Sequence, residues 1–167
     1  MASEIKVDTI VNAGGDNDTG IDLATNDQIL LKVANATKLT MNSTGQTTIV
    51  GEGGTTTTSV QQGLAKVWTH WNADGTPAFR DSFNSASISD HATGDQSINF
   101  TNGMSNAVYA TSGIVGNGND TDTANAQCRR GTSSTTAQRY TIQYCTSSAN
   151  NNYDYQYVSG IIHGDLA

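Results

Sequence analysis

The sequence predicts an all-β protein, with an N-terminal strand and a short intertwined β-shaft followed by a C-terminal antiparallel β-sandwich head of jelly-roll-like form. Apolar residues alternate with polar ones through much of the chain, which is the pattern of strands that bury one face. Turn-forming residues interrupt this alternation at short intervals. Only one proline occurs, and no segment combines a helical period with caps at both ends. The alternation favours polar β-structure over disorder.

The clearest alternation runs from Gly20 to Gly51, where large apolar residues occupy odd positions and Leu30 is the main exception. Turn signals cut this segment into short rungs that hold at most three large apolar side chains each, so one chain cannot build a core from them. Copies of the chain or a neighbouring protein must therefore cover the apolar face, as stacked repeats cover one another. The residues expected in this shared core are Ile21, Leu23, Ile29, Leu31, Val33, Leu39, Met41 and Ile49.

The first twenty residues contain a short alternating strand before a turn rich in glycine and aspartate. Such a segment is suited to adding to the edge of a partner's sheet, and Ile5, Val7 and Ile10 would make the contact. The alternative is that this strand is simply the first rung. We expect residues 1–20 to form an attachment segment, residues 21–60 the β-shaft with its neck, and residues 61–167 the head.

Tryptophan, phenylalanine and tyrosine appear from Leu64 onward, and the strand candidates become longer. About eight strands separated by turn residues are typical of an antiparallel sandwich or jelly roll. The segment His91–Asp95 reads as a hairpin turn with Gly94 at a positive φ. The predicted strands cover residues 64–71, 78–84, 85–90, 96–101, 107–116, 124–130, 135–146 and 153–163.

Composition argues against several classes of function. The net charge is −7, and neither half of the chain is basic, so nucleic-acid binding is not expected. No run of apolar residues is long enough to span a membrane, and no signal-peptide pattern follows Met1. Cys128 and Cys145 fit neither a disulfide framework nor a zinc spacing, and we expect two free thiols, with a disulfide as the alternative.

Catalytic and metal motifs are weak. The oxygen-rich segments 16–22 and 117–122 resemble Ca²⁺ loops only in part, so they are interpreted as polar turns. His70, His91 and His163 could belong to a Ser-His-Asp arrangement, but no nucleophile elbow accompanies them. No acidic pair stands out as the catalytic pair of a glycosidase. We expect a protein that is not an enzyme, with no cofactor and no bound metal.

The most promising binding residues lie in the C-terminal third. Tyr153, Tyr155 and Tyr157 alternate along one predicted strand next to Asn150–Asn152, and tyrosine rings beside amides suit a carbohydrate. Packing of this face inside the sandwich or on another subunit is the alternative. The loops 117–125 and 147–152 are rich in small polar residues, which adds Asn119, Asp120 and Asn151 to the candidate site.

Two other groups of side chains have a functional and a structural interpretation. Trp68 and Trp71 have opposite parity on one strand, so at most one faces the core, and the other would lie at a subunit interface or contact a receptor. Arg129, Arg130 and Arg139 form the only basic cluster. They would either make solvated or interchain ion pairs or contact an anionic lipopolysaccharide.

Three segments carry a resemblance to a known group of proteins. The runs AKVWTHWNADGTPAFRDSFN at residues 65–84 and SISDHATGDQSINF at residues 87–100, with SEIKVDTI at residues 3–10, resemble tail-fibre and other virion proteins of tailed bacteriophages, especially marine ones. The resemblance implies a homotrimeric virion appendage, with the odd-position residues above as its trimer core. It also implies assembly in the host cytoplasm.

Three functions are compatible with these observations. The first is a tail fibre that attaches by its N-terminus to another virion protein and contacts a host glycan or protein through Asn119, Asp120, Asn151, Tyr153 and Tyr155. The second is a decoration fibre on the capsid or connector, without a receptor of its own. The third, which the missing acidic pair disfavours, is a polysaccharide depolymerase.

Overall fold

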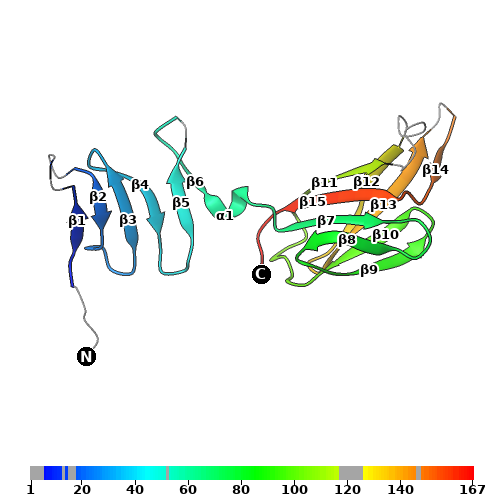
Figure 1. Ribbon diagram of the computed structural model, residues 1–167, viewed down its shortest axis with the longest axis horizontal. Coiled ribbons are helices and arrows are strands. Elements are labelled where there is room, and N and C mark those ends of the chain that lie inside the picture. The colour runs from blue at the N-terminus through cyan, green and yellow to red at the C-terminus, as the bar shows by residue number, and fades with distance from the viewer. Residues whose placement is uncertain (1–5, 13, 15–17, 52, 117–125, 146–147) are drawn as a thin grey trace. The chain divides into compact units, whose positions relative to one another are not determined.

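The computed structural model describes residues 6–12, 14, 18–51, 53–116, 126–145 and 148–167. The chain divides into two compact units, Met1–Gly63 and Leu64–Ala167, called here the N-terminal and C-terminal units. Both are built from antiparallel sheets (Figure 1). The predicted all-β class is therefore confirmed.

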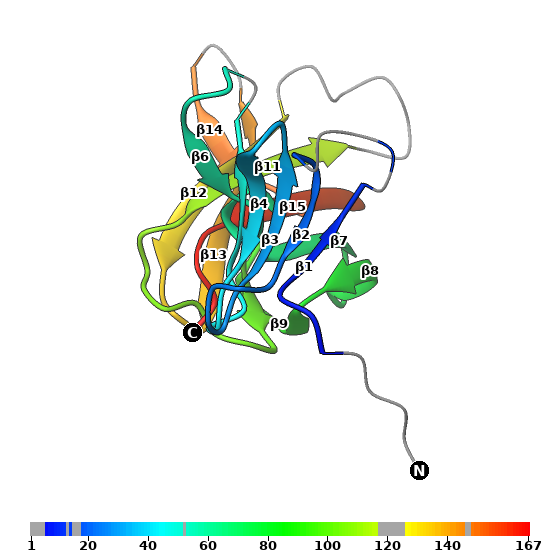
Figure 2. The same cartoon turned by 90° about the vertical axis from the view of Figure 1, so that its left-hand side faces the viewer.

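The N-terminal unit is a single six-stranded sheet in which each strand pairs with the next one along the chain (Figure 1, Figure 2). A four-residue helix, α1 (Val60–Gly63), follows the last strand. Sequential antiparallel pairing satisfies the backbone groups between neighbouring strands within one chain. The strands are β1 (Thr9–Val11), β2 (Gly20–Asp22), β3 (Ile29–Val33), β4 (Ala36–Met41), β5 (Thr47–Val50) and β6 (Thr57–Ser59).

The turns of this sheet fall where the sequence places its turn residues. Ala34 and Asn35 both have positive φ, 51° and 57°, and they link β3 to β4 in a two-residue hairpin, since Val33 pairs with Ala36. Two consecutive left-handed residues match the right-handed twist of the flanking strands. Gly45 (φ 78°) donates its amide to the Asn42 carbonyl at 3.0 Å and helps to close the β4–β5 turn.

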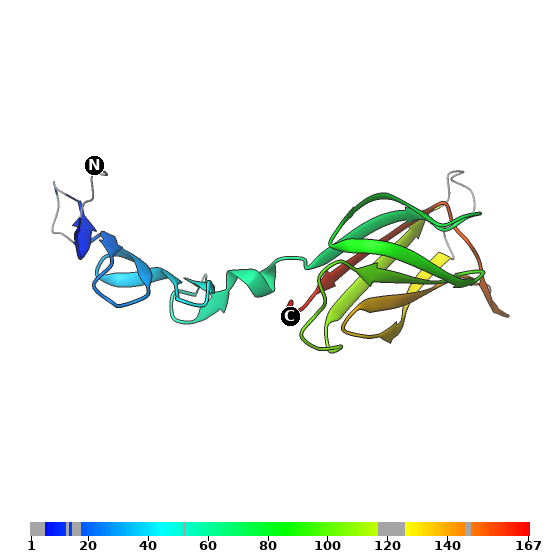
Figure 3. The same cartoon turned by 90° about the horizontal axis from the view of Figure 1, so that it is seen from below.

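The C-terminal unit contains two antiparallel sheets that enclose a common core (Figure 3). One sheet has the order β11-β15-β7-β8; the other has the order β12-β13-β10-β9, with β14 paired to β13. The strands are β7 (Val67–Asn72), β8 (Ala78–Phe83), β9 (Ser85–Ala92), β10 (Asp95–Phe100), β11 (Ala110–Gly116), β12 (Ala126–Ser133), β13 (Ala137–Cys145), β14 (Asn150–Asn152) and β15 (Tyr157–His163).

The core between the sheets is organised around Trp71, which has no exposed surface. Its ring lies 5.6 Å from that of Tyr140 on the facing sheet, measured between centroids. The Trp71 Nε1–H donates to Gln96 Oε1 at 2.7 Å, and Gln96 Nε2 donates to the Ala73 carbonyl at 3.2 Å. The buried amide of Gln96 is thus satisfied, as a polar group in an apolar core must be. Ile98, Ile142, Tyr155 and Val158 complete this cluster.

Two glycines on neighbouring strands make room for side chains of the facing sheet. Gly113 and Gly160 lie opposite each other on β11 and β15. A Cβ atom at Gly160 would lie 2.8 Å from the Tyr140 hydroxyl, and one at Gly113 would lie 2.5 Å from Cys128 Sγ. Close approach of another group is a common reason for glycine inside a strand. These glycines therefore allow Tyr140 and Cys128 to pack between the sheets.

The hairpin β9–β10 turns at Thr93–Gly94, because Ala92 pairs with Asp95. Gly94 has a φ of 65°, which confirms the positive φ that the sequence predicts there. A Cβ atom at this position would also lie 2.3 Å from the Ile142 carbonyl oxygen. Any residue other than glycine is strained and crowded here.

The last predicted strand, residues 153–163, is wrong in its first part. A short strand, β14, ends at Asn152, and β15 begins only at Tyr157. Between them the chain changes sheets, since the Tyr153 amide donates to Ile142 on one sheet and the Tyr155 carbonyl accepts from Ala73 at the end of β7. Tyr153, Tyr155 and Tyr157 therefore do not share one strand face.

Candidate functional site

Five apolar side chains lie opposite one another across the first five strands, and they are called here the apolar row. The register pairs Ile10 with Ile21, Ile21 with Leu31, Leu31 with Leu39, and Leu39 with Ile49. Directly opposed residues of antiparallel strands point to the same face of the sheet. The N-terminal unit thus carries one continuous apolar line perpendicular to its strands.

Nothing in the described part of the N-terminal unit covers the apolar row. Ile10 is 53% exposed, Leu31 38% and Ile49 37%, while Ile21 and Leu39 are half-buried. None of the residues described in this unit is buried, so the unit has no core of its own. Further apolar side chains at odd positions are also exposed: Leu23, Ile29, Val33 and Met41.

A shallow hollow of about 430 Å³ adjoins this surface at one end of the sheet. Its apolar wall consists of Leu23, Ile29 and Met41, and residues 25–28 with Asn42 supply its polar rim. An apolar hollow with a polar rim can receive an apolar side chain from another protein surface.

The opposite face of the same sheet is more polar. Leu30, Thr40 and Thr48 lie opposite one another across β3, β4 and β5, and Lys32 Nζ lies 2.5 Å from Asp22 Oδ2. The hydrogen bond from Lys32, together with the Ala24 amide, holds the pKa of Asp22 below its usual value. The two faces of the sheet therefore differ in character, and the apolar face carries the exposed apolar row.

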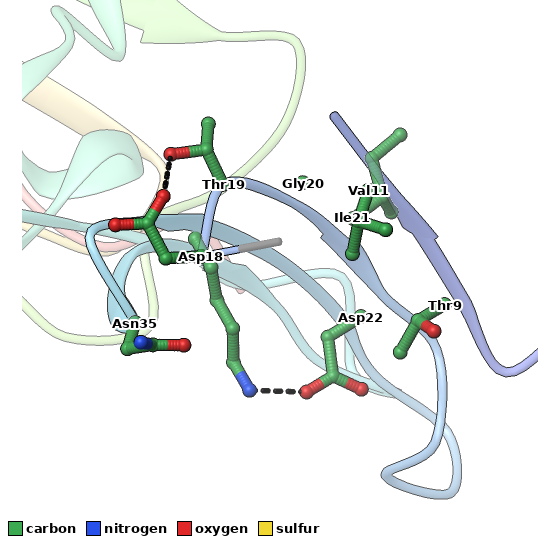
Figure 4. A pocket seen from close by; sticks show the side chains of 9 residues that line it. Thr9, Val11, Asp18, Thr19, Gly20, Ile21, Asp22 and Asn35 are labelled. Atoms are coloured by element: carbon green, nitrogen blue, oxygen red, sulfur yellow. Dashed lines mark hydrogen bonds and ion pairs between the residues drawn. The ribbon is translucent and has the colours of Figure 1, made fainter. Parts of the chain in front are cut away.

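A small pocket of about 100 Å³ lies at the β1–β2–β3 end of the sheet. Figure 4 shows Asp18 bonded to the hydroxyl of Thr19, and the carboxylate of Asp22 bonded to the lysine side chain of the adjacent strand. The charge of Asp22 is thus neutralised by Lys32 of the same chain. The volume of the pocket is about that of a few water molecules. This pocket does not indicate a ligand.

The predicted attachment strand is part of the same sheet. β1 pairs with β2, and Ile10 belongs to the apolar row, whereas Val7 lies before the strand and is 43% exposed. Ile5 lies outside the described residues. The arrangement favours the interpretation of this segment as the first rung, and the other edge of β1 is not paired with any described strand.

The predicted host-contact residues have three different outcomes. Asn119 and Asp120 lie outside the described residues. Asn151 is exposed on β14, and Tyr153 is 50% exposed, so both are available to a ligand. Gly94 donates its amide to Asp154 Oδ1 at 2.6 Å, which fixes the backbone next to Tyr153.

Tyr155 requires a correction. Only 2% of this residue is exposed, and it belongs to the core cluster that contains Trp71. The reason is the change of sheet at this point, which turns the side chain of Tyr155 inward while its ring packs 4.8 Å from the ring of Tyr153, measured between centroids. The buried Tyr155 ring therefore packs against the ring of the exposed Tyr153, and Tyr155 itself cannot contact a ligand at the surface.

The outer face of the four-stranded sheet carries a second exposed apolar surface, called here the outer patch. Trp68 lies opposite Phe83 on one side and Ile161 on the other, and Ile114 lies opposite Ser159 on the next row. Phe83 is 51% exposed, Ile114 71%, and Trp68 and Ile161 39% each. The sequence predicted one outward tryptophan on this strand, and the structure confirms this for Trp68.

The rim of the outer patch is polar and aromatic. The Arg80 guanidinium lies 4.4 Å from the centroid of the Tyr157 ring and donates two hydrogen bonds to the Gln156 carbonyl. The His70 ring stacks with the same tyrosine, at 6.0 Å from the Tyr157 ring between centroids. Sequence reasoning missed this surface, because Phe83, Ile114 and Ile161 lie far apart in the chain, although each has the parity of an outward residue on its strand.

The outer face of the other sheet is polar. None of the large hydrophobic residues that are exposed in the described chain lies on β9, β10, β12 or β13. Asn99 Nδ2 donates to the hydroxyls of Ser87 and Ser89 at 2.9 and 2.8 Å, and Gln143 Nε2 donates to Asn152 Oδ1 at 3.0 Å. The C-terminal unit thus has one polar and one apolar outer face.

The three arginines do not act as one cluster. Arg139 makes an ion pair with Asp95 through two hydrogen bonds, one of 2.5 Å from Nε. The guanidinium holds the pKa of the Asp95 carboxyl below its usual range. Arg129 donates to Gln143 at 3.2 Å, and Arg130 donates to Ser133 at 2.9 Å. Arg139 is therefore neutralised within the chain, which leaves a weaker basic surface than the sequence suggested.

The described residues hold no assembled catalytic or metal centre. His91 Nε2 lies 2.8 Å from Ser97 Oγ, but no described carboxylate is hydrogen-bonded to this imidazole to orient it, as a triad requires. No three described His, Cys, Asp or Glu side chains are grouped as metal ligands. Within the same residues, no helix is long and apolar enough to cross a membrane. The second Ca²⁺-like segment, 117–122, lies outside the described residues.

Both cysteines are free thiols. Cys128 packs against the main core, and this burial raises its pKa to about 12. A thiol that stays protonated at neutral pH is a poor nucleophile. Cys128 is therefore a packing residue, and the predicted alternative of a disulfide is wrong.

The chain matches no protein-family model, no curated protein and no solved structure.

Proposed function

We propose that this protein is a structural, self-associating fibre of a phage virion, a homotrimer whose N-terminal unit forms the trimeric shaft and whose C-terminal unit contacts the host surface. The observation that carries the proposal is the apolar row, which is exposed on a sheet without a buried residue. A face of this kind is stable in water only when another protein surface covers it.

Identical copies are the occupants that best fit the row. The first five strands each contribute one side chain to it, and these are aliphatic throughout, Ile10, Ile21, Leu31, Leu39 and Ile49. An apolar line on every copy is self-complementary, because each row can pack against the rows of its neighbours. Since neighbouring strands are hydrogen-bonded within one chain, association needs only side-chain packing and no exchange of strands.

Three copies suit a narrow sheet better than two. The strands of the N-terminal unit have three to six residues, so each presents only a few side chains to the covered face. Three narrow sheets arranged about one axis enclose their apolar faces on all sides, whereas two sheets placed face to face leave the lateral borders of the faces open. The resemblance to virion fibres, which are trimeric, agrees with this choice.

The C-terminal unit is proposed as the host-contact domain, jelly-roll-like in its two facing antiparallel sheets. Asn151 and Tyr153 are its exposed candidate residues, and they lie where the chain changes sheets, at an end of the sandwich. Such ends commonly carry recognition. A tyrosine ring with a neighbouring amide is suited to a glycan, and three copies would raise a weak affinity by avidity.

Host binding is tested by adsorption. The fluorescently labelled full-length protein is mixed with cells of the host bacterium, and we expect replacement of Asn151 and Tyr153 together by alanine to abolish cell-bound fluorescence. The matched control is the pair Ser87→Ala and Asn99→Ala on the polar outer face, which should bind as the parent does. Equal adsorption of all three proteins, with the trimer intact, would reject this site and favour a decoration fibre without a receptor.

A further inference from the structure

We propose that the outer patch, centred on Phe83, Trp68 and Ile161, is a contact surface for the C-terminal unit of a second copy of this chain. The inference rests on the proposed self-association of the N-terminal units. It adds a second contact between copies, made by their C-terminal units.

The first argument is the difference between the two outer faces of the C-terminal unit. None of the large hydrophobic residues that are exposed in the described part of the chain lies on β9, β10, β12 or β13, whereas the outer face of the other sheet carries Phe83, Trp68, Ile161 and Ile114. A sheet normally has one covered and one solvated face. Here the four-stranded sheet carries large apolar side chains on both faces, which is typical of a sheet that is covered on both.

The second argument is charge. The C-terminal unit carries an excess of acidic residues, so identical copies repel one another over most of their surface. Among its Asp, Glu, Lys and Arg residues, this sheet carries only Asp81 and Arg80 on its four strands. Their charges cancel. The outer patch is thus a part of the surface where two copies can meet without net repulsion, and its apolar centre with a polar rim has the usual anatomy of an interface.

The third argument is the short connection between the units. Only Leu64, Ala65 and Lys66 separate α1 from β7. Association of the N-terminal units therefore holds the C-terminal units at an effective concentration on the order of millimolar. A patch of a few apolar side chains, too small for a stable complex between free molecules, is sufficient under that constraint.

The side chains of the outer patch favour a protein over a sugar as the occupant. Two of its four members, Ile114 and Ile161, are aliphatic and β-branched. A glycan platform depends on aromatic rings with amides and hydroxyls beside them, whereas packed aliphatic and aromatic side chains together are typical of contacts between protein chains.

The two tryptophans of the chain provide a direct test. Trp71 has no exposed surface, while Trp68 is 39% exposed on a single chain, so a quencher added to the solution reports on Trp68. Acrylamide quenching is measured on the full-length protein, with the Trp68→Phe variant as the reference for Trp71 alone. We expect the assembled parent to be quenched as weakly as this reference, because the second copy shields Trp68.

A charged residue introduced into the outer patch should separate the C-terminal units there and expose Trp68. Ile161→Lys adds three charges to the interface of a trimer, so we expect a several-fold rise in the quenching constant of Trp68 while the mass in sedimentation stays that of the trimer. Gln127→Lys places the same charge on the exposed polar outer face at β12, and it should leave both measurements unchanged.

The outcomes separate this inference from the proposed function. A trimeric parent in which Trp68 is strongly quenched overturns the inference and leaves the shaft proposal standing. Strong quenching that falls when a glycan is added overturns it as well and assigns the patch to a ligand. A monomeric parent overturns the proposed function and, with it, the inference. A trimer with a shielded Trp68 that Ile161→Lys exposes supports both.

Discussion

Replacement of Leu31 by aspartate is expected to prevent assembly of the protein. Leu31 is the middle residue of the apolar row, with Ile21 on one side and Leu39 on the other. In a trimer, three uncompensated carboxylates would enter one narrow core, each at a cost of several kcal/mol. Sedimentation velocity should show monomers or aggregates in place of a trimer, and Leu39→Asp should give the same result.

Leu30→Asp is the matched control, because Leu30 is the adjacent residue and points to the opposite face of β3, across from Thr40. The account expects this variant to assemble. If the Leu31→Asp protein forms a trimer that melts at the temperature of the parent, the shared core has been assigned to the wrong face of the sheet.

Trp71→Ala should destabilise the C-terminal unit by about 3–5 kcal/mol, the usual cost of removing a large buried aromatic side chain. Two effects add to this loss. The cavity removes the packing partner of Tyr140, and Gln96 Oε1 loses its hydrogen-bond donor inside the core. Chemical denaturation followed by the circular dichroism of the full-length protein measures the change.

Tyr153→Ala is the control for this experiment, because it also removes an aromatic ring from the C-terminal unit but one that is 50% exposed. Its cost should be well below that of Trp71→Ala. Equal losses for the two variants would contradict the position of Trp71 as the centre of the core.

The alternation in the sequence was sufficient to predict the faces of the N-terminal sheet. A period of two assigns side chains to faces without knowledge of which strands pair, and Leu31, Leu39 and Ile49 do share one face in the register. The turns at Asn35 and Gly94 were also predictable, because a positive φ favours few residue types.

The position of Tyr155 could not be read from the same pattern. Its spacing from Tyr153 suggested a common face, but the chain changes sheets between them, and a crossing of this kind depends on partners distant in sequence, Ile142 and Ala73. Strand order is likewise set by long-range pairing, which periodicity does not encode.

The outer patch likewise depends on long-range strand pairing, which the local sequence pattern does not reveal. Opposite parity predicted that at most one of Trp68 and Trp71 faces the core, but only the register brings Trp68 between Phe83 and Ile161. The sequence therefore predicted one outward tryptophan and no apolar surface around it, because the pairing that brings Phe83 and Ile161 beside Trp68 is long-range.

The central claim is that copies of the same chain cover the apolar row, and the mass of the folded protein tests it most directly. Sedimentation equilibrium of the full-length protein at micromolar concentration should give about 52.5 kDa, three times the 17.5 kDa of one chain. A folded species of 17.5 kDa under these conditions, with the circular dichroism of an intact β-protein, would contradict the account.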